Sequence, residues 1–503
     1  MSRPVRRLVA VGSGPVVWLA ALSMLRAFRH RMLAVTVLDT GPAPDAPIGY
    51  WTLPSQRGMH ALLGIRETDL LMRTGATFKL ASEHLEWGGA RSRFLHAHGE
   101  IGTQIGATPF YKYLQKVAID GHPESPEKFS VAAIAANMAR FARPREDGGL
   151  TSSFTYGFHL EEAPYVAMLR DLAEKQGVQR IEGTLAQVAR APDGHLEALE
   201  FANGERLEGD LFLDCTGRRA SLMKLIESDA RDDWSSWLPC DRMYSAFANP
   251  QENPPPLTRI TASDAGWLWW APLAHASMVG HVYSSAHLSD DEALRALRQS
   301  APALTGEPRL NVFSSGKRKR PWLRNCIAIG EAAVELEPLV GAQLHFAQLG
   351  VGTLIELFPL DAHSQVEAAE YNRIVGEHAD ALRDFTLAHY HAGPGRAGKF
   401  WDDTRSAAVP ARLADKLDLY RASGRIVLLD YESFEELDWA WLLLGRGCTP
   451  ATLEAQIHGL VAGVSPTDVA PLHQHLVQLA NSMPPHAHFL RPAGARGARP
   501  PGP

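Results

Sequence analysis

The sequence has few cysteines, and they lie far apart. Its 503 residues include only four, with no Cys-x-x-Cys pair: Cys215, Cys240, Cys326 and Cys448. Neither a disulfide framework nor a cysteine-ligated zinc site is therefore expected to organise the fold. Scattered cysteines are typical of proteins in a reducing compartment, and we expect a cytoplasmic location.

The sequence also lacks a marked excess of charge and a long apolar run. Its 50 Lys and Arg residues against 56 Asp and Glu give a net charge of −6. This balance offers no reason to expect nucleic acid or an anionic membrane as a partner. The arginines before the first apolar segment resemble the start of a signal peptide, but Gly12–Pro15 interrupts that segment. No other stretch is long and apolar enough to span a bilayer.

Clusters of metal ligands are scarce as well. Two short histidine motifs, His389-Tyr390-His391 and His486-Ala487-His488, stand without clustered cysteine or carboxylate partners. Since metal sites usually combine several such ligands at fixed spacing, the sequence predicts no metal site.

The chain opens with a predicted strand, a glycine turn and a helix. Residues 8–11 are apolar, Gly12-Ser13-Gly14 follows, and an apolar helix is predicted from Pro15. The first turn of a helix carries unpaired N–H groups and a partial positive charge, which suit a pyrophosphate. The turn approaches the dinucleotide fingerprint Gly-x-Gly-x-x-Gly, although Val17 replaces the third glycine, which lets helix and strand pack closely.

A second predicted strand, residues 34–38, ends at Asp39. An acidic residue at this position commonly accepts hydrogen bonds from ribose hydroxyls. We therefore interpret Gly12, Ser13, Gly14 and Asp39 as candidate cofactor-binding residues. The alternative is an ordinary βαβ unit that binds no nucleotide.

Residues 65–88 are predicted to be helical. They contain Lys79, which Phe78 and Leu80 flank in a largely apolar neighbourhood. Most lysines are solvated surface charges, so this setting marks Lys79 as a candidate functional residue.

The remaining segments predict a mixture of helices and strands. A helix is predicted around residues 165–172, and a β-meander over residues 184–214 runs into a buried strand that ends near Gly217. The tryptophan-rich run 265–273 is interpreted either as a hydrophobic strand or as a wall beside a cofactor. From about residue 365 the pattern is helical.

Together these motifs resemble the flavin-dependent tryptophan halogenase family, and the resemblance covers nearly the whole chain. The motifs that carry it are Gly12 and Gly14 with Trp18, Phe78-Lys79-Leu80, Phe212–Gly217, Trp267-x-Trp269-x-Ala271-Pro272, Glu337-Pro338-Leu339, Arg383-Asp384-Phe385 and Arg421–Arg425. The tryptophan element is associated with halogenases rather than with ordinary flavin monooxygenases.

The resemblance implies an α/β (α+β) fold. We expect a Rossmann-like FAD-binding domain of the GR2 flavin-monooxygenase type, a mixed β-sheet substrate domain and a helical C-terminal cap. The FAD and substrate subdomains would share residues 1–385, the cap would span 386–490, and residues 491–503 would form a disordered tail.

The resemblance also implies an activity. A separate flavin reductase would supply reduced FAD, which with oxygen and a halide ion yields hypohalous acid. Lys79 matches the lysine that delivers halogen to a small, electron-rich aromatic substrate such as tryptophan or an indole. Cofactor contacts are implied at Gly217, Gly330, Glu331 and Leu339. Whether the protein forms a homodimer is an open question at this point.

Several positions depart from the family's pattern. The Glu-Ser that usually follows Glu-Pro-Leu is Val340-Gly341 here, although that glutamate helps to position the oxidant and can accept the ring proton. The flavin strap, usually Gly-Glu-Ala-Thr or Gly-Glu-Ser-Thr, is Gly49–Thr52. Two alternatives to a halogenase stay open: a relative without catalysis that acts as a binding or regulatory protein, and a flavin monooxygenase.

Overall fold

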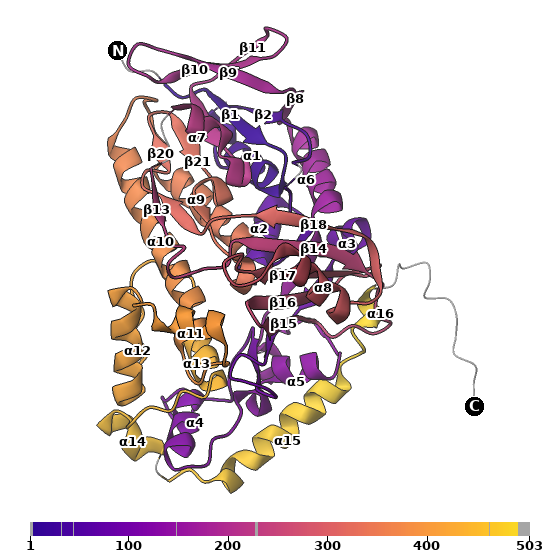
Figure 1. Ribbon diagram of the computed structural model, residues 1–503, viewed down its shortest axis with the longest axis vertical. Coiled ribbons are helices and arrows are strands. Elements are labelled where there is room, and N and C mark those ends of the chain that lie inside the picture. The colour runs from indigo at the N-terminus through magenta and orange to yellow at the C-terminus, as the bar shows by residue number, and fades with distance from the viewer. Residues whose placement is uncertain are drawn as a thin grey trace, which may run out of the picture.

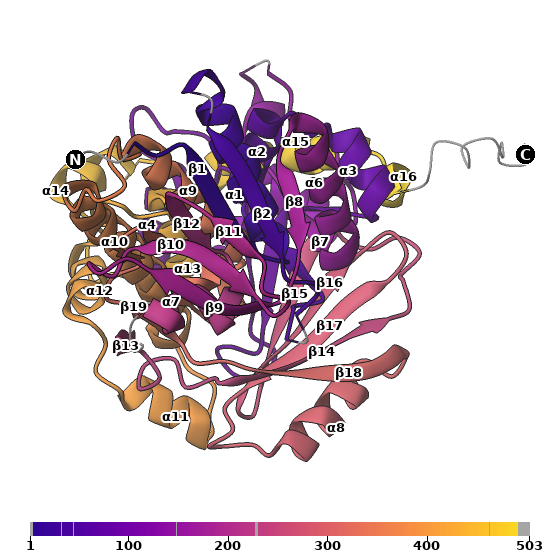
Figure 2. The ribbon, with the colours of Figure 1, turned by 90° about the horizontal axis from the view of Figure 1, so that it is seen from above.

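Two large sheets and the helices around them form the framework of the protein (Figures 1 and 2). The computed structural model describes residues 4–31, 33–43, 45–146, 148–226, 230–461 and 463–490. The tail predicted over residues 491–503 lies outside the described residues. Within the described ranges, no helix is long and apolar enough to cross a membrane.

The first sheet carries the glycine turn. In spatial order its six strands are β20 (Trp322–Leu323), β21 (Cys326–Ala328), β12 (Leu211–Asp214), β1 (Arg7–Gly12), β2 (Ala34–Asp39) and β8 (Gln179–Glu182). All neighbours run parallel except β20 and β21, and Leu8 pairs with both Val35 and Leu211. The predicted βαβ unit is therefore confirmed. Residues 8–11 are almost fully buried, as in parallel strands covered on both faces.

Three helices pack around the glycine turn. Helix α1 (Pro15–Ala27) follows the turn directly and contacts α6 (Glu162–Gln176) and α9 (Gln343–Glu356). Helix α6 confirms the helix predicted around residues 165–172, with Tyr165, Met168 and Leu169 buried. The starts of α1, α6 and α9 lie close to one groove, because residues at the start of each line it.

The second sheet is the predicted mixed sheet. Its order is β18 (Leu304–Val312), β14 (Arg242–Ala248), β17 (Ser277–Tyr283), β16 (Gly266–Pro272), β15 (Leu257–Ser263), β5 (Ala81–Leu85) and β6 (Arg93–Ala97). Only β15 and β5 run parallel. The tryptophan-rich run is β16, in which Trp267 and Trp269 are buried and Trp270 is half-buried, as strand alternation requires.

Three smaller sheets have three strands each. Their members are β9 (Leu185–Arg190), β10 (Leu196–Phe201) and β11 (Arg206–Glu208); β3 (Gly49–Trp51), β7 (Gly157–Glu161) and β4 (Thr77–Lys79); and β13 (Arg231–Asp233), β19 (Gly316–Arg318) and β22 (Val334–Glu335). The first set is the predicted meander, although β12, which follows it, joins the six-stranded sheet. The second set brings the strap residues and Lys79 onto the two sides of β7.

The prediction of one helix over residues 65–88 is wrong. Helix α3 (Glu67–Thr74) ends at Gly75, which adopts a left-handed conformation (φ 65°) and donates its N–H to Leu71 O. A Cβ at Gly75 would lie 2.5 Å from the ring of His275, so a glycine is needed at this close approach. The chain then forms β4 and β5, and Lys79 therefore lies on a strand.

Helices make up most of the C-terminal part, drawn in orange and yellow in Figure 1. They are α10 (Val366–His391), α11 (Lys399–Ser406), α12 (Ala411–Ser423), α13 (Glu436–Gly445), α14 (Ala455–Val461), α15 (Pro466–Ser482) and α16 (Ala487–Leu490). Helix α13 packs on β6, and α15 packs on α5 (Val131–Asn137). The other helices are α2 (Ser55–Leu63), α4 (Phe110–Ile119), α7 (Ser221–Ile226) and α8 (Asp290–Ser300).

A buried carboxylate fixes the turn that follows β12. Asp214, which is fully buried, accepts hydrogen bonds from the backbone N–H and the hydroxyl of Thr216 (3.1 and 2.6 Å). It also accepts the backbone N–H groups of Leu222 and Met223, both at 2.9 Å, in the first turn of α7. Asp214 thereby holds the Cys215–Gly217 turn, which lines the same groove as the glycine turn.

Replacing Asp214 with Asn is expected to destabilise the fold. The amide keeps the shape but turns one acceptor into a donor, so buried N–H groups lose their partner. We expect Asp214→Asn to lower the free energy of unfolding by about 2–4 kcal/mol, measured by denaturant unfolding. Asp233→Asn is the control, because Asp233 makes similar turn contacts to Ser235 at an exposed site. Equal stability of the two variants would contradict this account.

Candidate active site

Lys79 lines a cavity of about 450 Å³. Its side chain is 1% exposed, and its Nζ lies 2.7 Å from Nε2 of His98, which follows β6. An ammonium group has no acceptor, so Lys79 in that form donates and Nε2 accepts. Neutral His98 then carries its proton on Nδ1, a tautomer that follows from this hydrogen bond.

Burial shifts both members of this pair toward their neutral forms. Desolvation lowers the pKa of Lys79 to about 7, and the negative charge of Asp438 opposes part of that change. Burial also lowers the pKa of His98 well below its ordinary value, with further contributions from Lys79, His96 and His159. At neutral pH the imidazole is therefore uncharged, and Lys79 is divided between ammonium and amine.

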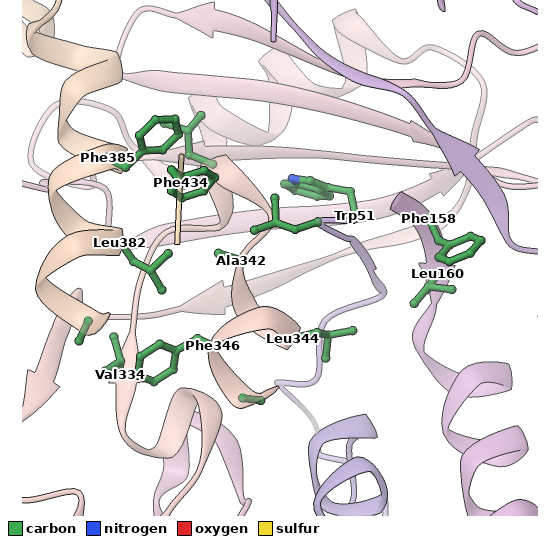
Figure 3. Close-up of a cluster of buried hydrophobic side chains, with 14 of the residues drawn as sticks. Trp51, Phe158, Leu160, Val334, Ala342, Leu344, Phe346, Leu382, Phe385 and Phe434 are labelled. Atoms are coloured by element: carbon green, nitrogen blue, oxygen red, sulfur yellow. The ribbon is translucent and has the colours of Figure 1, made fainter. Parts of the chain in front are cut away.

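Aromatic side chains form one wall of the cavity. Phe385 of α10 and Phe434 stack with their ring centroids 3.7 Å apart, and Trp439 meets Phe385 edge-on at 5.0 Å. Figure 3 shows the stacked pair. Trp441 also lines the cavity and donates its Nε1–H to Gly99 O at 3.0 Å. Such a wall suits a flat aromatic ligand.

Several other polar groups of the cavity already have partners. His96 Nε2 lies 2.9 Å from Asp438 Oδ1, and the other oxygen of Asp438 accepts the N–H of Glu435. His389 makes a hydrogen bond through Nδ1 to Phe385 O, and burial lowers its pKa to about 3. His345 is held through Nδ1 by Ser55 at 2.8 Å.

The segment after Glu337 reaches the same cavity. Leu339 and Val340 both line it, so Leu339 lies with Lys79 rather than with the glycine turn. Gly341 adopts a left-handed conformation (φ 68°), and a Cβ there would lie 2.4 Å from Trp51 O. Gly341 and Trp51 of the strap, two positions at which the chain departs from the family's pattern, therefore lie in close contact.

A separate groove contains the glycine turn. Ser13, Gly14, Gly217 and Glu331 line it. Gly14 is the N-cap of α1 and supplies no side-chain cap, so the first N–H groups of that helix face no side chain of their own cap. A Cβ at Gly12 would lie 2.4 Å from Cys215 O, which explains the glycine where β1 meets the turn after β12.

Asp39 lies in an adjoining cavity of about 790 Å³ and is already engaged. Its Oδ2 accepts Nε and Nη2 of Arg180 at 2.9 and 2.7 Å, and its Oδ1 accepts the N–H of Gly41 at 3.1 Å. A ribose contact at Asp39 would share the carboxylate with Arg180. Arg180 has no recognisable motif in the sequence and could not be predicted.

Glu162, at the start of α6, faces the glycine turn. Its Oε1 is 3.6 Å from the position of a Cβ on Gly14, and its buried Oε2 has no hydrogen-bond partner. Burial raises the pKa of Glu162 to about 8, helped by Glu331 and Asp45 and opposed by Arg309. In the sequence it is only the second residue of a Glu-Glu pair, so no motif indicated it.

Small cavities lie between the groove and the Lys79 cavity. Glu331 lines the groove and also both of two small cavities. The first small cavity is lined by Gly330 and Val340 as well, and Val340 also lines the Lys79 cavity. Trp269 of the tryptophan-rich strand lines the other, where its ring lies 4.9 Å from that of Trp51.

The chain is similar to known halogenases along most of its length. The family profile described as tryptophan halogenase matches residues 7–460. The chain belongs to the tryptophan halogenase family. Tryptophan 6-halogenase SttH of Streptomyces toxytricini is 27% identical to it, over 88% of this chain and 89% of the relative.

Solved structures agree with this assignment. BrvH, a flavin-dependent halogenase from Brevundimonas sp. BAL3, matches with a TM-score of 0.91 at 32% identity, over 97% of this chain and 99% of its own. Xcc4156, a flavin-dependent halogenase from Xanthomonas campestris, has a TM-score of 0.90 at 33% identity, over 97% and 98%. The predicted family and fold class are confirmed, and the family is one of enzymes that use flavin and halide.

One group of potential metal ligands lies outside these cavities. Among the described residues, donor atoms of Asp193, His195 and His363 lie within 4.8 Å of one another. The two rings are stacked, with centroids 4.1 Å apart and planes 22° from parallel. Nearly parallel rings direct their in-plane lone pairs side by side rather than toward one ion, so this arrangement gives no support for a metal site.

The buried amine of Lys79 should reduce stability in a pH-dependent way. Its pKa is lower in the folded than in the unfolded chain, so the unfolded chain binds more protons between about pH 7 and 10.5 and stability rises with pH across that window. At pH 6 the free energy of unfolding of Lys79→Met should therefore exceed that of the wild type by on the order of 3 kcal/mol. This difference should shrink toward pH 10.

The matched control is Lys112→Met, at a second buried lysine. Lys112 donates to Gly424 O at 2.8 Å and pairs with Glu454 at 3.2 Å, so its loss should destabilise the protein. Thermal unfolding of both variants from pH 6 to 10 measures the contrast. A Lys79→Met variant that is less stable than wild type at pH 6 would contradict it.

Proposed function

We propose that this protein is a flavin-dependent halogenase that uses reduced FAD, oxygen and halide to halogenate an electron-rich aromatic compound through Lys79. The observation that carries the proposal is the burial of the Lys79 amine in a cavity with an aromatic wall. An amine with a pKa near 7 can hold hypohalous acid as an ammonium donor or react with it as a neutral nucleophile.

The proposed substrate is flat, aromatic and indole-like. The stacked pair Phe385 and Phe434 offers an apolar surface for such a ring, and His84, stacked on Phe94 at 4.5 Å, lines the same cavity. Relatives named as tryptophan 6-halogenases support an indole ring as the starting point of a search. Phenols share the electron-rich character and belong in the same panel.

Cofactor binding is proposed for the groove beside α1. The N–H groups after Gly14 would hold the pyrophosphate, with the Gly12 and Gly217 turns allowing close approach and Asp39 reaching the ribose side. Bound reduced FAD would supply the oxidation of halide to hypohalous acid. We further propose that a separate flavin reductase in the cytoplasm delivers it.

The two sites are proposed to communicate through the small cavities. Glu331 borders the groove and Val340 borders the Lys79 cavity, and one small cavity touches both residues. Hypohalous acid is small enough for such a route. Keeping the flavin groove apart from the substrate would prevent direct transfer of oxygen to the ring.

Loss of the Lys79 amine should abolish halogenation without affecting the flavin site. With a reductase, FAD and bromide, wild-type protein should give a halogen-dependent product from an indole and phenol panel. Lys79→Met should lower this rate by at least about 10³-fold, because the group that delivers halogen is gone. FAD-dependent oxygen consumption should stay at the wild-type rate, and Lys112→Met should still halogenate.

This experiment also separates the alternatives. Normal halogenation by Lys79→Met would exclude the lysine route. A hydroxylated product that forms without halide would indicate a monooxygenase. No product and no FAD binding would favour a binding or regulatory protein.

FAD affinity should depend on the protonation of Glu162. Below pH 8 the side chain is mainly neutral, whereas its carboxylate would repel the pyrophosphate at Gly14. Raising the pH from 7 to 9 should weaken FAD binding by about tenfold, as measured by flavin fluorescence on titration. Glu162→Gln should bind with little change over this range.

Asp171→Asn provides the control for this titration. Asp171 lies on the exposed side of α6, where it pairs with Arg73. It should keep the wild-type pH dependence. A flat wild-type profile, or the same slope in Glu162→Gln, would rule out Glu162 as the cause.

A further inference from the structure

Within the described residues, no carboxylate of the cavity stands free beside Lys79, where the reaction needs a base. Val340 occupies the position at which the family's glutamate would accept the ring proton. Asp438 is held by His96 and by the N–H of Glu435, whereas Glu100 and Glu435, which also line the cavity, are exposed. The proton must therefore go to a different group.

His98 is the group that is best placed to take it. Its Nε2 lies 2.7 Å from Lys79 Nζ, the one side-chain hydrogen bond that the amine makes within the described residues. The imidazole is 8% exposed and lines the cavity. Because Nε2 accepts from the ammonium, its lone pair is the basic position of the ring.

We propose that His98 and Lys79 form a proton-relay pair in which His98 Nε2 removes the proton from the halogenated ring carbon. This inference rests on the proposed halogenase function, since hypohalous acid is its oxidant. It assigns to His98 the role that Val340 cannot perform.

The ring carbon attacks the halogen of hypohalous acid, so a carbon–halogen bond forms and the halogen–oxygen bond breaks. The Lys79 ammonium protonates the departing hydroxide, which leaves as water. His98 Nε2 then takes the ring proton, and the C–H electron pair restores aromaticity. Finally the imidazolium returns its proton to the neutral Lys79 amine, which resets both residues.

Burial and the neighbouring histidines favour the last step. Burial is the main cause that disfavours a positive charge on His98, and His96 on β6 and His159 on β7 act in the same direction. Asp438 on α13 favours the charged form of Lys79. A proton on His98 therefore moves downhill to the Lys79 amine across the existing hydrogen bond.

Two other histidines of the cavity, His84 and His345, have a buried ring nitrogen without a partner, and the alternative base compared with His98 is His345. Its Nε2 is buried without a partner and burial lowers its pKa to about 4, but no hydrogen bond joins it to Lys79. It could accept a proton yet could not return it directly to the amine. The two histidines thus make different predictions on substitution.

The test compares His98→Gln with His345→Gln in the reductase-coupled reaction. Glutamine at 98 can still accept a hydrogen bond from Lys79 but cannot carry the proton, so it separates positioning from base catalysis. We expect the halogenation rate of His98→Gln to fall by about 10²–10³-fold. Oxygen consumption, FAD binding and thermal unfolding should stay close to wild type.

A substrate deuterated at the halogenated carbon provides the decisive readout. If ring deprotonation becomes rate-limiting, His98→Gln should show a primary isotope effect that wild type lacks, which a purely structural defect would not produce. His98→Ala should regain part of its rate when imidazole is added. His98→Phe serves as a second variant if the others fold poorly, with the same expected isotope effect.

The outcomes separate the relay from the function on which it rests. An active wild type, together with a His98→Gln variant of wild-type rate and no isotope effect, would overturn the relay alone. The same is true if only His345→Gln shows the loss and the isotope effect. Wild-type protein that makes no halogen-dependent product in any panel would overturn the proposed function and the relay with it.

Discussion

The desolvation of the Lys79 amine is the constraint on which the candidate active site depends. An ammonium ion in water is strongly hydrated, and only 1% of this side chain remains exposed. No carboxylate contacts the amine within the described residues, and its one hydrogen-bond partner is a neutral imidazole. A fold that only required stability would place an apolar residue here, so the buried lysine is best explained by chemistry.

The departures from the family pattern are linked by contacts. Trp51, in the strap, packs on Trp269, and its carbonyl oxygen would lie 2.4 Å from a Cβ at position 341. A serine at Gly341 could not fit without moving the strap. The tryptophan and the glycine therefore accommodate each other, and Val340 beside them leaves His98 as the base next to Lys79. Trp51, Val340 and Gly341 thus lie together at the boundary between the groove and the Lys79 cavity.

The sequence predicted those parts of the structure that local patterns determine. The β1–turn–α1 unit, the meander β9–β11 and helix α6 follow from apolar periodicity and glycine placement, and all three are present. The helix predicted through Lys79 failed because tertiary contacts decided it. Gly75 ends α3, and pairing of Thr77–Lys79 with β7 then selects a strand over helical propensity.

The partners of the site residues could not be predicted for a similar reason. His98 is 19 positions from Lys79, Arg180 is 141 from Asp39, and Glu162 is 148 from Gly14. Such contacts arise only when the sheets assemble, and no spacing rule in the sequence encodes them. The apolar setting of Lys79 and the resemblance to a family indicated this lysine, but neither could indicate that His98 lies beside it.

Burial shifts the pKa values of Glu162 and Lys79 in opposite directions, so that both groups titrate in the same pH range. It raises the pKa of the Glu162 acid to about 8 and lowers that of the Lys79 base to about 7. Below pH 7 the lysine is mainly the ammonium from which the proposed relay starts, and this form declines as the pH rises through 7. Above pH 8 the glutamate is mainly charged and would repel an anion at the glycine turn. Both proposed sites should therefore lose competence on the alkaline side, and the low dielectric of the interior sets both pKa values.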